Sequence, residues 1–240
     1  MSTRPTHVAP ARLAALALAL LVAACPSSPT PDDADSGPTE DPYALPDLPA
    51  AEVPRFLRDR INAMREQAGL DPLLNFTELE AAAQSHAQYV ADGIAGHFFH
   101  TQVPNTPGFT GETYRARAEA AEYPHVVMGE LIAFRRDTKL APLWLEGPYA
   151  RALVLQQHAK YIGIGSASGE MGPAAVLLAG FRASDGIPTA GDVIWPADGA
   201  TGVPRSWDPE WTTPMPKEPA TGWPSGPVIS VVFAPDQPYT

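Results

Sequence analysis

The residues that could do chemistry centre on a short aromatic stretch, "HFFH", in which His97 and His100 are three positions apart. If a helix continued through this stretch, the two imidazoles would share one face and could hold a divalent metal such as zinc. In the other interpretation His97 is solvated and His100 alone is functional, as half of a catalytic or binding pair. Pro104 and Pro107 follow, so the stretch is expected at the end of a helix or just beyond it.

The common catalytic motifs are absent from the sequence. It contains no G-x-S-x-G elbow, no H-E-x-x-H, no P-loop and no dinucleotide-binding fingerprint that opens a helix. The glycine-rich "GIGSASGEMG" is assigned to a hairpin, where turn formation is expected to explain its glycines. The chain has a single cysteine, Cys25, which we assign to lipidation, so cysteine-nucleophile catalysis is excluded.

Apolar periodicity predicts the helices that would position these side chains. Residues 54–69 place apolar side chains on one helical face and end at a glycine typical of a helix C-terminus. A capping-box pattern of Thr77 and Glu80 predicts the start of a second helix, whose core-facing stripe includes His86. We therefore interpret His86 as a packed, hydrogen-bonded residue.

The second half of the pattern predicts a sheet. A third helix is expected from Thr110, as its cap, to about Ala121, and His125 and His158 are expected on the surface at element ends. Apolar runs at residues 126–134, 160–168 and 174–182 predict three strands, the last two forming a hairpin, and residues 139–155 predict a helix between the first strand and that hairpin. Helices on both sides of such a sheet give an α+β fold, a three-layer α/β/α sandwich.

The N-terminus predicts export and a lipid anchor. Arg4 and Arg12 precede an apolar run that is long enough for a signal peptide and too short to span a bilayer. The run ends in "VAAC" at Cys25, which is similar to a bacterial lipobox, in which the thiol carries a diacylglycerol. The alternative is a plain secretory signal with an incidental cysteine. Pro26, rather than aspartate, follows Cys25, which argues against retention in the inner membrane and favours the outer membrane or the cell surface.

Composition divides the chain into four parts. Residues 1–25 are the predicted signal peptide, 26–50 a disordered linker rich in Pro, Ser and Asp, 51–187 the folded domain, and 188–240 an extension rich in Pro, Gly and Trp with one clear strand at 228–233. The extension has features of an immunoglobulin-like domain but is too short for a complete one. The formal net charge of −11 and the lack of a basic run exclude nucleic acid as an expected partner.

Five short motifs occur in an order and spacing similar to the CAP superfamily, the cysteine-rich secretory, antigen 5 and pathogenesis-related proteins that share the SCP domain. They are "FFHT" at His100, "PGFTGETYRARAEAAEY", "GELIA" at Glu130, "WLEGPYAR" and "YIGIGSA". The resemblance covers residues 53–182 and is closest to the bacterial members.

The resemblance implies a cleft with two histidines and two acidic residues, which binds a divalent metal in some members. The first histidine and first glutamate correspond to His100 and Glu130, and the second acidic position to Glu146. The second histidine is absent, because the family's "HR" pair is Ala150-Arg151 here. Arg151 is then a candidate to pair with Glu130 in place of that histidine. Zinc remains a candidate cofactor, with His100, Glu130 and His97 as ligands.

Three functions follow as expectations. The first is a lipid-anchored envelope protein that binds a lipid, glycan or protein through a degenerate His/Glu cleft, without catalysis. The second is a metal-assisted hydrolase, a protease or envelope amidase, with Glu130 as general base and His100 as metal ligand or acid. The third is an adhesion or scaffold module at the cell surface, favoured by the linker and the extension.

Overall fold

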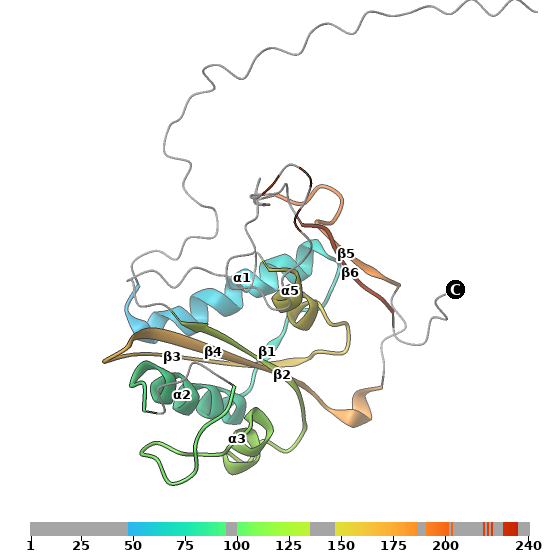
Figure 1. The fold of residues 1–240 in the computed structure, drawn as a ribbon. Coiled ribbons are helices and arrows are strands. Elements are labelled where there is room, and N and C mark those ends of the chain that lie inside the picture. Colours follow the sequence, from blue (N-terminus) through green and yellow to red (C-terminus); the bar gives the residue numbers. More distant parts are fainter. Residues whose placement is uncertain are drawn as a thin grey trace, which may run out of the picture. The chain divides into compact units, whose positions relative to one another are not determined.

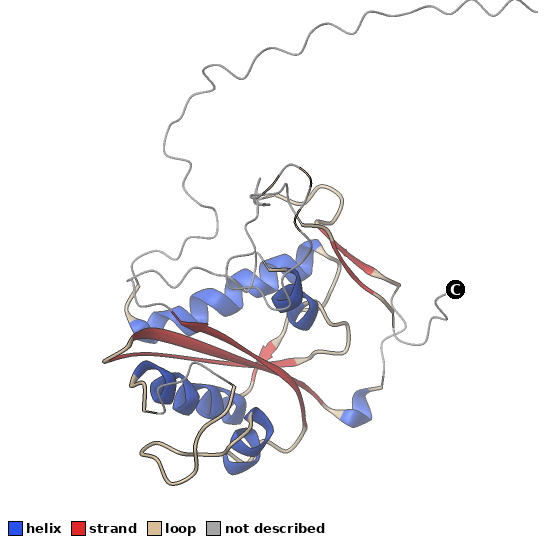
Figure 2. Cartoon of the chain, viewed as in Figure 1, coloured by secondary structure: helices blue, strands red, loops and turns tan. Residues whose placement is uncertain are grey.

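The computed structural model describes residues 48–94, 100–134, 147–186, 191–201 and 228–234, together with residues 203, 218, 220 and 222. Cys25, most of the predicted linker, His97 and Glu146 lie outside the described residues. None of the described helices is both long and apolar enough to cross a lipid bilayer. The described chain forms three layers, with helices on both faces of one sheet (Figures 1 and 2), which confirms the predicted α/β/α sandwich.

The central sheet has four strands in the order β1-β3-β4-β2. Its strands are β1 (Leu74–Asn75), β2 (Val126–Phe134), β3 (Tyr161–Gly169) and β4 (Gly172–Phe181). The three long strands are antiparallel neighbours and match the predicted runs, whereas the two-residue β1, which pairs parallel to β3, has too little pattern to be predicted. A register irregularity between Val127 and Gly129 interrupts the β2–β4 pairing just before Glu130.

One face of the sheet is covered by α2 (Thr77–Ala91) and α3 (Tyr114–Ala120). The helix α2 lies directly on β3 because Gly163 and Gly165 have no side chains there. A Cβ on Gly163 would collide with the backbone of Leu79 and Glu80, and one on Gly165 with the backbone of Gln84. The expectation that turn formation explains these glycines was therefore wrong, since they permit close helix–strand packing inside the strand.

The other face is covered by a short 3-10 helix, η1 (Ala50–Glu52), by α1 (Val53–Gln67) and by α5 (Pro148–Val154). Arg65 of α1 is 1% exposed and donates hydrogen bonds to the carbonyl oxygens of Val154, Gln156 and Ala159 at and beyond the end of α5. Those carbonyls have no partner within the helix, so the guanidinium satisfies them. Burial lowers the pKa of Arg65 to about 10, against a smaller opposing effect of Asp71.

After β4, a second 3-10 helix, η2 (Ala183–Asp185), leads to a two-stranded antiparallel ribbon of β5 (Val193–Trp195) and β6 (Ser230–Val232). Sequence reasoning found β6 and missed β5, whose three residues carry little signal. Val193, Trp195 and Val232 pack into the same hydrophobic cluster as α1 and α5. The ribbon therefore packs on that layer, and the immunoglobulin-like interpretation of 188–240 stays a prediction.

Two predicted helix caps were wrong. The side chain that caps α3 is Thr113, which accepts a hydrogen bond from the backbone N–H of Ala116, rather than Thr110. Thr77 is the first residue of α2 itself, so no capping box forms, and the Glu80 carboxylate instead accepts from the side-chain amide of Asn75.

Candidate functional site

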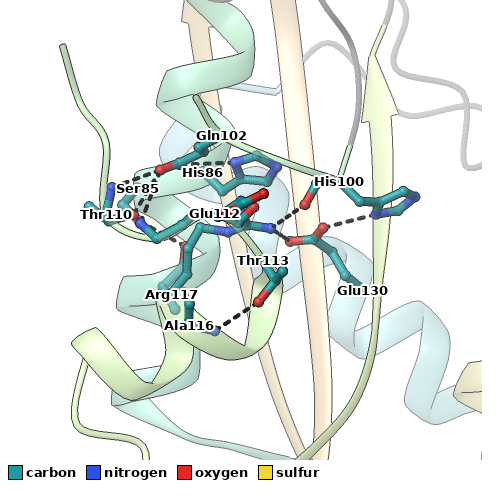
Figure 3. Close-up of polar contacts among 12 residues, drawn as sticks. Ser85, His86, His100, Gln102, Thr110, Glu112, Thr113, Ala116, Arg117 and Glu130 are labelled. Atoms are coloured by element: carbon teal, nitrogen blue, oxygen red, sulfur yellow. Dashed lines mark hydrogen bonds and ion pairs between the residues drawn. The ribbon is translucent and has the colours of Figure 1, made fainter. Parts of the chain in front are cut away.

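His100 and Glu130 meet, although they are thirty residues apart in the sequence (Figure 3). His100 lies in the loop between α2 and α3, and Glu130 lies in the middle of β2. The distance from Nδ1 of His100 to Oε2 of Glu130 is 2.9 Å, and the two side chains are 59% and 1% exposed. The pair therefore has an outward-facing imidazole whose inner nitrogen contacts a buried carboxylate.

The second partner of Glu130 is Arg117, whose side chain is completely buried. Its Nη2 lies 2.6 Å from Oε1 of Glu130 and donates also to the backbone carbonyl of His100 at 3.1 Å. Its Nη1 donates to the carbonyls of Gly111 and Glu112. One guanidinium thus neutralises the buried carboxylate and ties the backbone at His100 to the backbone just before α3.

The loop is also fixed to α2 through Gln102, which is 1% exposed. Its side-chain oxygen accepts a hydrogen bond from the N–H of Thr110 at 2.7 Å, so its amide nitrogen faces Nδ1 of His86 at 3.0 Å. An amide nitrogen can only donate, so Nδ1 of His86 accepts and its proton is on Nε2. His86 is 0% exposed, which confirms its prediction as a packed, hydrogen-bonded residue.

A second attachment is made by Tyr89, one turn further along α2. Its hydroxyl accepts from the N–H of Val103 at 3.0 Å and lies 2.9 Å from the hydroxyl of Thr106. Ser85 approaches Thr110 at 3.2 Å on the same helix. These contacts hold residues 100–113 against the helix, so the backbone of His100 is positioned by packing that lies outside the His–Glu pair.

Hydrogen-bond chemistry assigns the tautomer of His100. The Glu130 carboxylate, paired with Arg117, offers only lone pairs, so Nδ1 of His100 carries the proton and donates it. In the neutral imidazole Nε2 is then an acceptor, on the side of the exposed ring away from Glu130. The arrangement can therefore accept one hydrogen bond from a ligand, or supply one nitrogen lone pair to a metal.

A metal centre made from both His100 and Glu130 does not fit this geometry. Both carboxylate oxygens already contact Arg117 or His100, and a cation on that buried carboxylate would lie against a guanidinium of the same charge. Within the described part of the chain, no three His, Cys, Asp or Glu side chains come together in a way that could hold a metal ion. The predicted ligand His97 and the candidate Glu146 lie outside that part.

Arg151 is not the partner of Glu130, so that prediction was wrong. It lies on α5, whose buried residues belong to the cluster on the opposite face of the sheet. It is 2% exposed and donates to the backbone carbonyl of Val228 before β6. Ala150, at the position of the second family histidine, packs against the same cluster.

One hollow among the described residues is separate from the His–Glu pair. It has a volume of about 410 Å³ and lies between α3 and the start of β2. Its lining residues are Arg115, Ala118, Glu119, Tyr123, Pro124, His125, Val126 and Val127. His100 therefore presents its ring on the protein surface, outside this hollow.

Two histidines expected on the surface are half-buried instead. His125 stacks on Tyr161 with ring centroids 5.6 Å apart, and its edge meets Phe76 and Tyr123. His158 meets the ring of Phe181 edge-on, and burial lowers the pKa of its imidazole. Neither residue contributes to the His100 site.

Arg117 and Gln102 are the site residues that sequence reasoning missed. Arg117 occurs in "YRARAEA", where two arginines two positions apart must point to different sides of a helix. The neighbouring Arg115 is exposed and Arg117 is buried, but the short α3 has too few apolar residues to show which side is which. Gln102 follows His100 by two residues, and no periodicity applies in a loop.

Comparisons with known proteins agree with this architecture. The model of the cysteine-rich secretory protein family, CAP, matches residues 58–178, just over half of the chain. A search of curated protein sequences found none significantly similar to this chain.

Several solved structures are similar to the chain. An extracellular protein with an SCP domain from Bacillus anthracis is 19% identical with a TM-score of 0.45, over 55% of this chain and 41% of that one. An outer surface protein from Borrelia burgdorferi is 18% identical with a TM-score of 0.43, over 58% and 98%. A cysteine-rich secretory protein from Staphylococcus aureus is 16% identical with a TM-score of 0.41, over 57% and 40%. The chain thus spans about two fifths of the Bacillus and Staphylococcus chains.

Proposed function

Because this chain belongs to the cysteine-rich secretory protein family, CAP, we propose that it is an exported, lipid-anchored protein that binds a ligand or partner at the cell envelope through His100. In this proposal Glu130 and Arg117 position the imidazole and take no part in bond breaking. The anchor is the acylated thiol of Cys25, at the end of the predicted signal peptide.

The observation that carries the proposal is that each oxygen of Glu130 accepts a hydrogen bond in a side chain that is 1% exposed, so water and substrate do not reach its remaining lone pairs. A general base needs a lone pair directed at the water or hydroxyl that it deprotonates. In Glu130, Oε1 accepts from Arg117 at 2.6 Å and Oε2 from His100 at 2.9 Å, in a side chain that is 1% exposed. The carboxylate therefore has the role of an orienting group, and the metal-assisted hydrolase is the weaker candidate.

What remains for a ligand is Nε2 of His100. In the tautomer set by Glu130 this nitrogen accepts a hydrogen bond, so it suits an O–H or N–H donor of a glycan, a peptide or a lipid headgroup. Its position is fixed by Arg117, which binds both the backbone carbonyl of His100 and the carboxylate behind the ring. A fixed acceptor loses little side-chain entropy on binding, which favours recognition.

Histidine NMR tests the binding site directly. Long-range ¹H–¹⁵N spectra should show His100 with its proton on Nδ1 and His86 with its proton on Nε2, as opposite tautomers in one protein. The protein is titrated separately with a soluble muropeptide, with palmitate and with zinc chloride. A probe that binds should shift the ring resonances of His100, while those of buried His86 serve as the internal control. A His100 ring with its proton on Nε2 would contradict the proposed role of Glu130.

Catalytic turnover together with tight zinc binding by the wild-type protein would contradict the proposal. Hydrolysis of peptide or peptidoglycan by the wild type that is abolished in Glu130→Gln would establish the hydrolase. Submicromolar zinc binding by calorimetry that is lost in His100→Ala would restore a metal role for the imidazole.

The lipid anchor is tested separately by metabolic labelling with an alkyne fatty acid in a bacterial host. Because Cys25 is the only cysteine in the chain, Cys25→Ala should remove all label and release the protein from the membrane fraction. Label that persists in Cys25→Ala would refute the assigned anchor.

A further inference from the structure

The ribbon of β5 and β6 has an outward face that consists of large apolar side chains. Along both strands, alternate residues are buried and exposed, as expected for a ribbon with one face on the core. The exposed set, which we call the outer ribbon face, is Ile194 (53%), Ile229 (71%), Val231 (42%) and Phe233 (54%). Ile194 and Val231 are cross-strand partners at its centre.

The ribbon is firmly connected to the domain, so this face is held in one orientation. Trp195 is 1% exposed and packs with Val193 and Val232 in the cluster of α1 and α5. Arg151 donates to the carbonyl of Val228 on one side, and the carboxylate of Asp192 accepts from the N–H of Ala234 on the other. Packing on one face therefore leaves the other face directed outward.

The size and chemistry of the face favour one kind of occupant. The exposed parts of these four residues have a combined area on the order of 400 Å², which is in the range of functional apolar patches on monomers. A stable protein dimer needs roughly twice that area from each partner. The one exposed carboxylate beside these side chains in the described ribbon is that of Asp192, which is engaged by the N–H of Ala234, so the face offers few of the polar groups that give a protein interface its specificity.

The position of the face relative to the anchor completes the argument. The linker enters at η1 and α1, and α1, α5 and the ribbon all cover the same face of the central sheet (Figure 1). The 22 residues 26–47 are rich in proline and acidic residues, which extend a linker beyond the root-mean-square span of about 25 Å of a flexible chain of this length. The fifteen-residue α1 is about 22 Å long. A lipid attached at Cys25 would keep the ribbon within reach of the bilayer surface.

We propose that the outer ribbon face docks on the lipid surface to which the chain is anchored. This inference rests on the proposed acylation of Cys25, which supplies the high local concentration that lets a small apolar patch act. The anchored chain then has a second, weak contact that orients the domain. With the formal net charge at −11, the contact is expected with neutral phosphatidylcholine and is weakened by added phosphatidylglycerol.

The test uses residues 26–240, which include every described residue, with an N-terminal hexahistidine tag on phosphatidylcholine vesicles that contain a nickel-chelating lipid. This chain has no cysteine, so Val231→Cys can carry a single environment-sensitive fluorophore. The matched control is Val126→Cys, because Val126 is also a strand valine that is 42% exposed but lies beside α3 on the other face of the sheet. Circular dichroism establishes that both variants fold.

The expected result is a fluorescence increase of about threefold or more at position 231, with quenching by doxyl lipids, and no change at position 126. Ile194→Asp should abolish the change at 231. An equal response at both positions, or none at 231, would overturn the inference. A rise at 231 that depends on protein concentration without vesicles would also overturn it and would assign the face to a second copy of the chain.

Failure of the anchor and failure of the ribbon contact are distinguishable, because the nickel lipid replaces the acyl chain. If Cys25 is not labelled by the fatty acid but the position-231 signal is present, the proposed anchor is refuted and the lipid-binding face is supported. Labelling at Cys25 without the position-231 signal would remove the ribbon contact alone.

Discussion

Replacing Arg117 with methionine should separate a positioned site from an incidental surface pair. The substitution keeps much of the apolar stem and removes the guanidinium that pairs with Glu130 and bonds the carbonyls of His100, Gly111 and Glu112. Removing one member of a buried ion pair leaves an uncompensated charge and costs about 3–5 kcal/mol. The three carbonyls lose a charged donor as well, so we expect at least this loss from a domain stability of about 5–15 kcal/mol.

The assay is urea unfolding followed by tryptophan fluorescence and circular dichroism, with the free energy of unfolding taken from coincident transitions. Arg115→Met is the matched control, because Arg115 is exposed on the same short helix, two residues away. It should change stability by no more than about 0.5 kcal/mol. Arg117→Lys should recover only part of the loss, since a single ammonium cannot reach four acceptors in a fixed geometry.

The double variant Arg117→Met/Glu130→Leu removes the buried charge with its partner. It should be less destabilised than the sum of the two single variants, with a coupling of about 1.5 kcal/mol or more. In Arg117→Met the His100 ring signals should also broaden or shift, because the loop loses its fixed carbonyl. A loss below about 1 kcal/mol in Arg117→Met, or no coupling with Glu130, would refute the role given to this guanidinium.

Three further predictions concern the frame around the site. Gly163→Ala should destabilise the domain by about 3 kcal/mol or more, because a Cβ has no room under α2, whereas Gly191→Ala, where nothing lies within 4 Å, should be nearly neutral in the same urea assay. Burial, more than the nearby Tyr161, raises the pKa of Tyr123 above its ordinary 10.0. The protonated hydroxyl therefore stabilises the fold fully below pH 10.0, and this contribution is lost as the pH rises through the raised pKa. Tyr123→Phe should accordingly make the alkaline side of the pH–stability curve flatter. Burial lowers the pKa of His158 below 6.5, so stability is lost as the pH falls through that value, and His158→Leu should make the acid side of the pH–stability curve shallower.

Some residues of the site can be identified from local sequence, and others only from long-range packing. His100 and Glu130 were predicted together because each belongs to a short motif whose neighbours identify it. The identity of the residue behind the carboxylate was missed, since Arg117 and Arg151 are both arginines on short helices and local spacing gives no reason to choose. Only the placement of α3 beside β2, and of α5 on the opposite face of the sheet, separates them.

By itself, the sequence determined the long helices and strands and the family, and it missed the two short strands β1 and β5. The apolar spacing in α1, α2 and the three long strands reflects which side chains must be buried, and that spacing is a local property of the chain. The motifs around His100 and Glu130 are equally local. Together these local patterns predict the three-layer fold.

The tertiary structure decided which groups meet. The pattern predicts a turn at Gly163 and Gly165, whereas α2 lies directly on them. The exposed side of the ribbon is fixed only by the side that Trp195 buries. The physical reason is the same in each case. A side chain's partner depends on segments far away in the chain, and no spacing within one segment records where those segments will pack.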